Sequence, residues 1–273
     1  AYGTARALPP AEVIRRDSAE WERRAGALAV PEHLPETIPL AERTRITRAA
    51  RRAMLHVLNG TDAATGMVVA SIARQAPYGL DWPRDGAFFD DAFDIGGLPG
   101  NTTRRLAWAL PLARREPVLP SQIFALTDPA PPLDPRTNTR QYPEAAWEMN
   151  YYNTGAMGGF FRFEIDNTAL MVWSASTHLA FLSNEERMTT AARWWPRIRR
   201  SADLLADWRD AETGLHALAN EDDNAAFSAT LHGGTTVFAA LEACARVARL
   251  MGEPAVASRW ERRASELRDA LVR

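Results

Sequence analysis

The stretch of the chain best suited to chemistry is Trp82-Pro83-Arg84-Asp85, which lies where a loop is expected to enter a helix. Pro83 suits the first position of that helix, and the Gly96-Gly97 pair suits its exit. An aromatic ring can stack on the C–H face of a sugar, while an arginine and an aspartate can hold neighbouring hydroxyl groups as donor and acceptor. An ordinary ion pair beside a core tryptophan explains the same residues.

A run of acids in the same segment, Asp90-Asp91-Ala92-Phe93-Asp94, matches the Asp-Asp-x-x-Asp pattern with which class I terpene synthases hold magnesium against a diphosphate. Hard cations prefer several carboxylate oxygens on one side of a helix, so the spacing makes chemical sense. The alternative is a solvated acidic face. Five apolar side chains share the opposite arc of this helix: Phe88, Phe89, Ala92, Phe93 and Ile95.

A second acidic group, Glu221-Asp222-Asp223, lies in a loop ahead of an apolar helix, with His216 and His232 nearby. These residues could bind a metal, although their spacing matches no known ligand pattern. They could instead hold a carboxylic acid whose pKa is raised by its acidic neighbours, as a general acid needs. A solvated loop is the third interpretation. Ahead of another apolar helix, Asp166 is predicted to be the N-cap residue.

The composition excludes several classes of protein. The 273 residues carry a net charge of −2, which indicates neither a nucleic-acid partner nor a membrane surface. Cys244 is the single cysteine, so there is no disulfide framework, and no apolar run is long enough to span a membrane. The chain begins with alanine and shows no signal-peptide pattern, so we expect a processed or trimmed, soluble bacterial protein, either cytoplasmic or secreted.

The first half of the chain is predicted to contain helices separated by irregular segments. Residues 10–28 and 40–58 have amphipathic patterns, and residues 66–72 are apolar and β-branched, as in a strand or an extended segment. After the helix that begins at Pro83, Asn101 is predicted to cap a helix that ends at Arg115. Its arginines are expected to face solvent: Arg104, Arg105, Arg114 and Arg115. Residues 117–159 form a long irregular segment of the kind that often lines functional sites.

The second half of the chain alternates two kinds of helix. Residues 166–182 and 229–250 are apolar nearly all round, whereas residues 190–208 and 254–271 are apolar along one face only. A two-layer helical toroid needs this alternation of inner and outer helices, whereas a four-helix bundle would make every helix one-faced. The order of elements also argues against a doubly wound sheet. The pattern predicts an all-α fold built of helical hairpins.

Three blocks of the sequence together resemble glycoside hydrolase family 15, the glucoamylases and their bacterial relatives. Residues 82–87 resemble the family's Trp-x-Arg-Asp-(Ser/Ala)-(Ala/Phe) signature. Residues 162–170 are similar to its Arg-Pro-Gln-x-Asp-Gly-Pro-Ala-Leu block. Residues 221–224, followed by Phe227 and Thr230, are similar to its general-acid segment, Glu-Glu-x-Asn. The blocks occur in the family's order within residues 66–250.

The resemblance implies an (α/α)6 toroid that hydrolyses α-glucosidic bonds with inversion and without a cofactor. It assigns Glu221 as the general acid and implies that Arg84 and Asp85 hold the terminal glucose, with Trp82 stacked beside it. The resemblance implies three further substrate-binding residues: Arg162 and Asp222 within these blocks, and Phe160, two positions before the second block.

The chain departs from the family pattern in two places. Asn167-Thr168 replaces Gly-Pro, and Phe160 lacks the hydrogen-bond donor of the tryptophan that the family often has there. The resemblance also places the catalytic base beyond this chain. It therefore suggests a linker helix and connection over residues 1–38 and an incomplete toroid over residues 39–273. A sugar-binding toroid without activity remains the non-enzymatic alternative.

The toroid hypothesis makes a geometric prediction. The three blocks should meet at one end of the buried helices, with Glu221 facing Arg84 and Asp85 across a cleft one sugar wide. Asp90, Asp91 and Asp94 should point away from that cleft.

Overall fold

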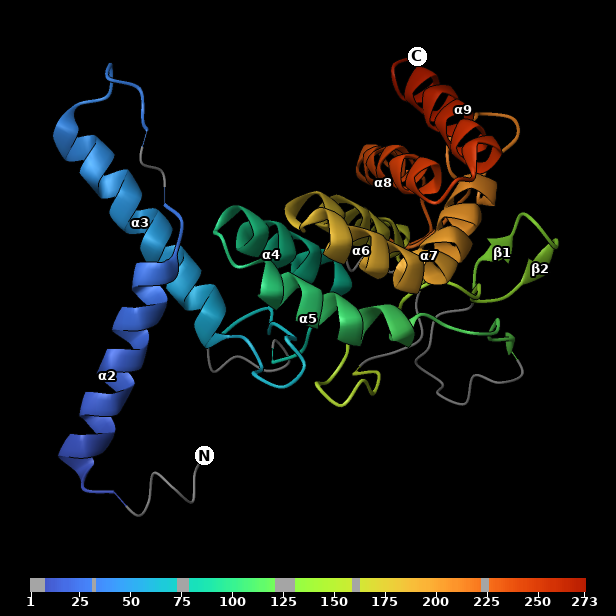
Figure 1. The fold of residues 1–273 in the computed structure, drawn as a ribbon. Helices are drawn as coiled ribbons and strands as arrows, with labels where there is room; N and C mark the ends of the chain where they lie inside the picture. Colours follow the sequence, from blue (N-terminus) through green and yellow to red (C-terminus); the bar gives the residue numbers. More distant parts are fainter. Residues whose placement is uncertain (1–7, 31–32, 73–78, 121–130, 159–162, 222–225) are drawn as a thin grey trace.

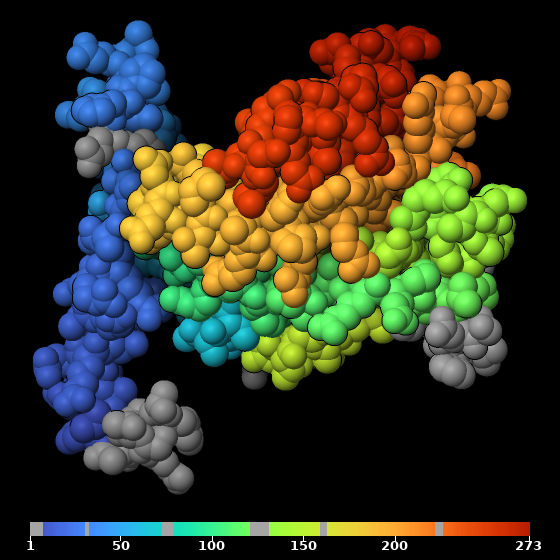
Figure 2. Space-filling view, turned by 45° about the vertical axis from the view of Figure 1, so that its right-hand side comes forward, coloured from blue at the N-terminus to red at the C-terminus, as the bar shows by residue number. Residues whose placement is uncertain are grey.

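The computed structural model describes residues 8–30, 33–72, 79–120, 131–158, 163–221 and 226–273. Its helices form a packed body and an arm to one side of it (Figure 1). The arm consists of α2 (Pro10–Ala27) and α3 (Leu40–Asn59), close to the predicted ranges. The space-filling view shows the arm standing against the body rather than within it (Figure 2). No helix in the described part of the chain has the length and apolar character needed to cross a membrane.

The body begins with α4 (Pro83–Ile95), which starts with the expected proline and ends at the expected glycine pair. Gly97 there has φ +77°, a conformation that residues with a side chain rarely adopt. The next helix, α5 (Pro99–Ala109), begins before Asn101, so the prediction of an Asn101 cap is wrong. Leu98 is its N-cap residue, and a short 3₁₀ turn, η1 (Leu110–Leu112), extends its end.

Four further helices complete the body: α6 (Ile165–His178), α7 (Asn184–Asp207), α8 (Leu231–Leu250) and α9 (Pro254–Leu271). The turn η3 (Leu179–Phe181) follows α6. The α7 helix begins before the predicted residue 190, because Ser183 and Glu186 form a reciprocal capping box.

Inner and outer helices alternate as predicted. In α6, 12 of 14 residues are buried, whereas in α9 only five of 18 are. The inner helices α4, α6 and α8 pack on one another in that order, and α5, α7 and α9 lie outside them. Figure 1 shows these hairpins side by side across the body.

Extended structure is sparse in the described residues. The irregular segment between α5 and α6 contains a small hairpin of two strands with two residues each, β1 (Leu133–Asp134) and β2 (Thr139–Arg140). Residues 66–72 form no ladder; one isolated bridge pairs Val68 with Thr61. The segment is therefore an extended approach to α4, the second of the two predicted possibilities.

The predicted orientation of α4 is right for Phe93, which is fully buried, and wrong for four other residues of the helix. Asp90 and Asp94 are buried, at 1% and 6% exposure, whereas Phe88 and Ile95 are 57% and 65% exposed. These two acids are buried because side chains of α5 and α6 form hydrogen bonds and ion pairs with them. The prediction that all the arginines of the α5 region face solvent also fails: Arg105 is fully buried and Arg114 is largely so.

Candidate active site

Arg84 joins the first turns of α4 and α6. Its Nη1 lies 2.9 Å from Asp166 Oδ2 and 3.4 Å from Glu164 Oε2, and the side chain is only 11% exposed. Its backbone N–H donates to Asn167 Oδ1 at 2.8 Å. The Asn167 amide in turn donates to Glu164 Oε2 at 2.5 Å. The first of the three sequence blocks is thus bound directly to the second.

Asp166 serves this site rather than capping its helix, so the N-cap prediction is wrong. Glu164 occupies the N-cap position, and its side chain caps no backbone N–H group. Asp166 Oδ2 contacts His232 Nε2 at 3.1 Å as well as Arg84. Burial would raise the pKa of Asp166, but His232 and the charge of Arg84 outweigh it and lower that pKa. Asp166 is therefore an ionised carboxylate that ties α4 and α6 to the start of α8.

Glu221 lies against the N-terminus of α8. Its carboxylate accepts hydrogen bonds from the backbone N–H groups of Thr230 (3.2 Å) and Gly233 (2.8 Å), and from the Thr230 hydroxyl. The residue is 2% exposed. A Cβ at position 233 would lie 2.5 Å from the Glu221 carboxyl carbon, so only glycine leaves room for this carboxylate.

Of the alternatives open for the acidic loop, a pKa raised by acidic neighbours does not hold for Glu221. Burial acts to raise it, but His216, Thr230 and the backbone donors outweigh burial and lower the pKa. The prediction counted the acidic neighbours in sequence, whereas the neighbours in space are hydrogen-bond donors at a helix N-terminus. A helix N-terminus favours negative charge.

His216 lies beside the carboxylate of Glu221. The Nε2 atom of His216 lies 3.1 Å from Glu221 Oε1, and Nδ1 lies 2.8 Å from the Ala217 carbonyl oxygen. A carbonyl oxygen only accepts, so Nδ1 carries a hydrogen. Nε2 therefore faces the Glu221 carboxylate at a distance that suits an ion pair when the imidazole is charged.

The backbone brings the second and third blocks together. Asn220 N–H donates to the Phe163 carbonyl at 3.0 Å, and Ile165 N–H donates to the Asn220 carbonyl at 3.1 Å. Glu164 and Asn220 therefore pair as in a parallel bridge. With Arg84 bound to Glu164, all three blocks lie at the same end of α4, α6 and α8. This part of the geometric prediction is confirmed.

Of the other predicted site residues, two lie within the described part of the chain and three do not. Trp82 is 5% exposed at the N-cap of α4, so it is mostly buried, and Asp85 is half-buried in the first turn. Phe160, Arg162 and Asp222 lie outside the described residues.

A buried ion-pair network behind the site was missed by the sequence analysis. Arg105 donates to both oxygens of Asp81, at 2.6 and 2.8 Å, and to Asp90 Oδ2 at 2.7 Å. Ser174 donates to the same Asp90 oxygen at 2.8 Å. Burial raises the pKa of Asp90 to about 7, even though Arg105 opposes the shift. One arginine shared by two buried carboxylates leaves an excess of negative charge, and protonation of Asp90 relieves it.

The same network requires Gly86. A Cβ at this position would lie 1.6 Å from Arg105 Nη2, so the guanidinium occupies the space that any side chain would need. No local pattern pointed to this contact, since Gly86 and Arg105 lie in different helices.

The magnesium hypothesis is not supported by these contacts. Asp90 is bound by Arg105 and Ser174, and both oxygens of Asp94 lie 2.9 Å from His178 Nδ1. Across the described ranges, no group of three or more His, Cys, Asp or Glu side chains has an arrangement that could hold a metal ion. The Asp-Asp-x-x-Asp spacing here serves to pack α4 against α5 and α6.

Comparison with solved structures identifies the fold. A bacterial glucoamylase complexed with acarbose superposes with a TM-score of 0.65 at 12% identity, over 96% of this chain and 32% of the glucoamylase. A glycosidase variant superposes with a TM-score of 0.60 at 21% identity, over 85% of this chain and 58% of its own. Another, in complex with glucose, gives a TM-score of 0.56 at 19% identity with the same coverage. The chain has the fold of the α-toroid glycosidases.

The helices α4 to α9 are therefore hairpins of an α-toroid, and the chain spans about a third to somewhat over half the length of these toroid proteins. No family model matches the sequence, and no curated protein matches it.

Proposed function

We propose that this chain is part of a glycoside hydrolase that acts on α-glucosides, with the sugar bound at the N-terminal end of α4, α6 and α8. The observation that carries the proposal is the direct contact among the three sequence blocks, through the Arg84–Asp166 ion pair and the backbone pairing of Asn220. If these residues were only unrelated surface features of separate helices, contacts among all three loops would not be expected. Glycosidases of the same fold, one complexed with acarbose and one with glucose, support the substrate class.

The charged groups at this end suit a sugar. Arg84 presents donors and Asp85 presents acceptors, and neighbouring hydroxyl groups of a pyranose need both. His232, which contacts the buried Asp166, is the most open side chain beside them, with 46% of it exposed. We assign Arg84 and Asp85 to the terminal glucose, with Trp82 as an apolar wall behind them.

Glu221 is the proposed general acid, with His216 as its proton partner. Inverting hydrolysis needs one carboxylic acid to protonate the leaving oxygen and a second carboxylate to activate water. The lowered pKa of Glu221 leaves little of it protonated at neutral pH, so we assign the neighbouring His216 as the group that returns a proton to it. Catalysis should favour acidic solution, where more of Glu221 is in its acid form. The proposal assigns no residue as the base.

A second candidate function is sugar binding without hydrolysis. It is favoured by the same carboxylate: Glu221 is buried and bound by the Thr230 and Gly233 N–H groups, an arrangement that stabilises the ionised form. In this case Glu221 would act as an anionic cap that orders α8 beneath the sugar.

We also propose that residues 1–38 link the toroid to a preceding segment. In the described residues α2 packs on α3, and Ala29, just after α2, donates its N–H to the Gly96 carbonyl at the end of α4.

Calorimetry and an assay of glucose release, both with maltose and isomaltose, separate the two candidates. Hydrolysis that is lost in Glu221→Gln, with sugar affinity retained, supports the acid role, because glutamine keeps the shape and removes the transferable proton. Normal turnover by Glu221→Gln contradicts that role. Binding without turnover in the unmodified protein, over pH 4–7, supports the non-catalytic candidate.

A further inference from the structure

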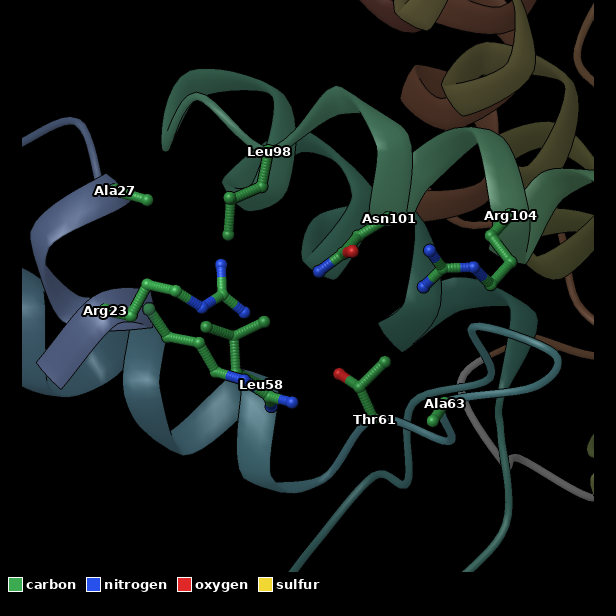
Figure 3. A pocket seen from close by; sticks show the side chains of 9 residues that line it. Arg23, Ala27, Leu58, Thr61, Ala63, Leu98, Asn101 and Arg104 are labelled. Carbon is green, nitrogen blue, oxygen red and sulfur yellow. The ribbon is translucent and has the colours of Figure 1, made fainter. Parts of the chain in front are cut away.

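A cavity of about 410 Å³ lies between the arm and the body, away from the site described above. It is bounded by the end of α2, the end of α3 and the start of α5 (Figure 3). Leu58 and Leu98 form its apolar wall, and Asn101 contributes an amide. Arg23 and Arg104 direct their guanidinium groups into it from opposite sides (Figure 3).

The charge of this cavity is positive. Arg23, Arg24 and Arg104 line it, and no acidic side chain does so among the described residues. Arg23 and Arg24 share one nearby carboxylate, that of Glu20, at 2.7 Å from each. Arg104 forms no ion pair with any acid in the described part of the chain. Three guanidinium groups therefore face one carboxylate, an excess of two positive charges.

The walls of the cavity are held in place by backbone contacts. At Gly66 the chain has φ +77°, and a Cβ there would lie 2.6 Å from the backbone nitrogen of Arg105. The loop after α3 thus lies directly on α5. On the other side, Ala29 N–H donates to the Gly96 carbonyl at 2.9 Å, and Leu28 is buried. These contacts anchor the end of α2 beside α4.

The first turn of α5 adds to the positive potential. Its N-cap residue, Leu98, supplies no side-chain acceptor to the free N–H groups of that turn. Helix N-termini attract anions through such N–H groups and through the helix dipole. Here the effect reinforces the arginines, which define the site.

We infer that this cavity binds a small molecule carrying a phosphate group. A phosphate monoester bears close to two negative charges at neutral pH and three acceptor oxygens, which match the excess charge and the forked donors of Arg104. Arg23, whose Nε and Nη2 already donate to Glu20, adds its charge from the other side. A carboxylate would leave one of the two charges unbalanced. The volume suits a ligand of sugar-phosphate size, with Leu58 and Leu98 against its carbon skeleton. The bound anion would tie α2 to α5 and fix the arm on the body. This inference does not depend on the proposed glycosidase activity.

Calorimetric titration with glucose 6-phosphate tests the inference, with glucose as the neutral probe and glucuronate as the carboxylate probe, all at one ionic strength. Arg104→Gln is the test variant, and Arg262→Gln is its control, because Arg262 is an exposed arginine on α9 that lines no part of the cavity. Both positions are on the surface, so the fold should persist; thermal unfolding checks this. Arg23→Gln provides a second test variant from the arm side.

The expected result is binding of glucose 6-phosphate that weakens at least about tenfold in Arg104→Gln and in Arg23→Gln, and is unchanged in Arg262→Gln. Glucose and glucuronate should bind at least about tenfold more weakly. Absence of binding, equal loss in Arg104→Gln and Arg262→Gln, or equal affinity for glucuronate would each overturn the inference. If affinity for glucose 6-phosphate were lost only in Arg84→Gln, the phosphate would bind in the proposed sugar site, which would also overturn the inference.

Discussion

Arg84 and Asp166 lie 82 positions apart in the chain, and their side chains meet at 2.9 Å between Nη1 and Oδ2. This contact fixes the first turn of α4 to the first turn of α6, and both side chains are largely removed from solvent. It is the point at which the sequence blocks become one site.

Replacing Arg84 with glutamine should lower the free energy of unfolding by about 3 kcal/mol, since breaking a buried pair leaves an uncompensated charge. The variant leaves Asp166 and Glu164 without their guanidinium partner. Urea unfolding measures the change, with Arg262→Gln as the surface control. An effect on Arg84→Gln no larger than on the control would show that the pair does not hold the helices together.

Replacing Gly86 with alanine should destabilise the protein severely, because the new methyl group would collide with Arg105 Nη2 at 1.6 Å. We expect a loss of about 3 kcal/mol or more, as the buried pairs of Arg105 with Asp81 and Asp90 must shift. Gly100→Ala is a matched control: it lies near the start of a helix, and its added Cβ would meet nothing within 4 Å. This control should be neutral or slightly stabilising. Equal thermal stability of the two variants would contradict the packing described for Gly86.

Replacing Asp90 with asparagine should change how stability depends on pH. Its pKa of about 7 in the folded protein exceeds the value of about 3.9 in an unfolded chain, so the folded state binds the proton more tightly. Asp90 therefore favours folding most below about pH 4, and that contribution is lost as pH rises towards 7, with a slope of up to about 1.4 kcal/mol per pH unit. The difference in unfolding free energy between Asp90→Asn and the unmodified protein should therefore shift in favour of the variant over this range. A difference that stays constant, or that shifts the other way, would mean that Asp90 is ionised throughout.

Replacing His216 with phenylalanine should raise the pKa of Glu221, because His216 is the strongest of the contacts that lower it. If Glu221 is the general acid, the alkaline limb of the pH–rate profile should move to higher pH, while maximal turnover falls because the proposed proton source is lost. A profile measured from pH 4 to 8 checks both effects. An unshifted alkaline limb would contradict the pairing of Glu221 with His216 in catalysis.

The sequence sufficed for the order of the helices and for the alternation of inner and outer ones. Both follow from local apolar periodicity, as in α6 and α9, and they do not depend on distant partners. The predicted helix boundaries were wrong where capping residues determine the start of a helix. The α7 helix begins at Asn184, because Ser183 and Glu186 cap it there, and not where its apolar pattern begins.

The sequence misled where a side chain finds its partner on another helix. Helical periodicity places the acids of α4 in solvent, because the pattern contains no sign of Arg105 and Ser174, which bind Asp90, or of His178, which binds Asp94. For Glu221, neighbours in sequence predicted a raised pKa, whereas neighbours in space lower it. Hydrophobic periodicity predicts which positions of a helix face inward when its neighbours are apolar. It fails where polar side chains on neighbouring helices bind buried acids.

Hydrogen–deuterium exchange with and without saturating maltose tests the central claim, that sugar binds where the three blocks meet. We expect slower exchange in the first turns of α4, α6 and α8, and in the backbone around Asn220, with the arm helices α2 and α3 unchanged. The protection should disappear in Arg84→Gln at the same maltose concentration. Maltose that alters none of these segments, or that protects only segments elsewhere, would contradict the account.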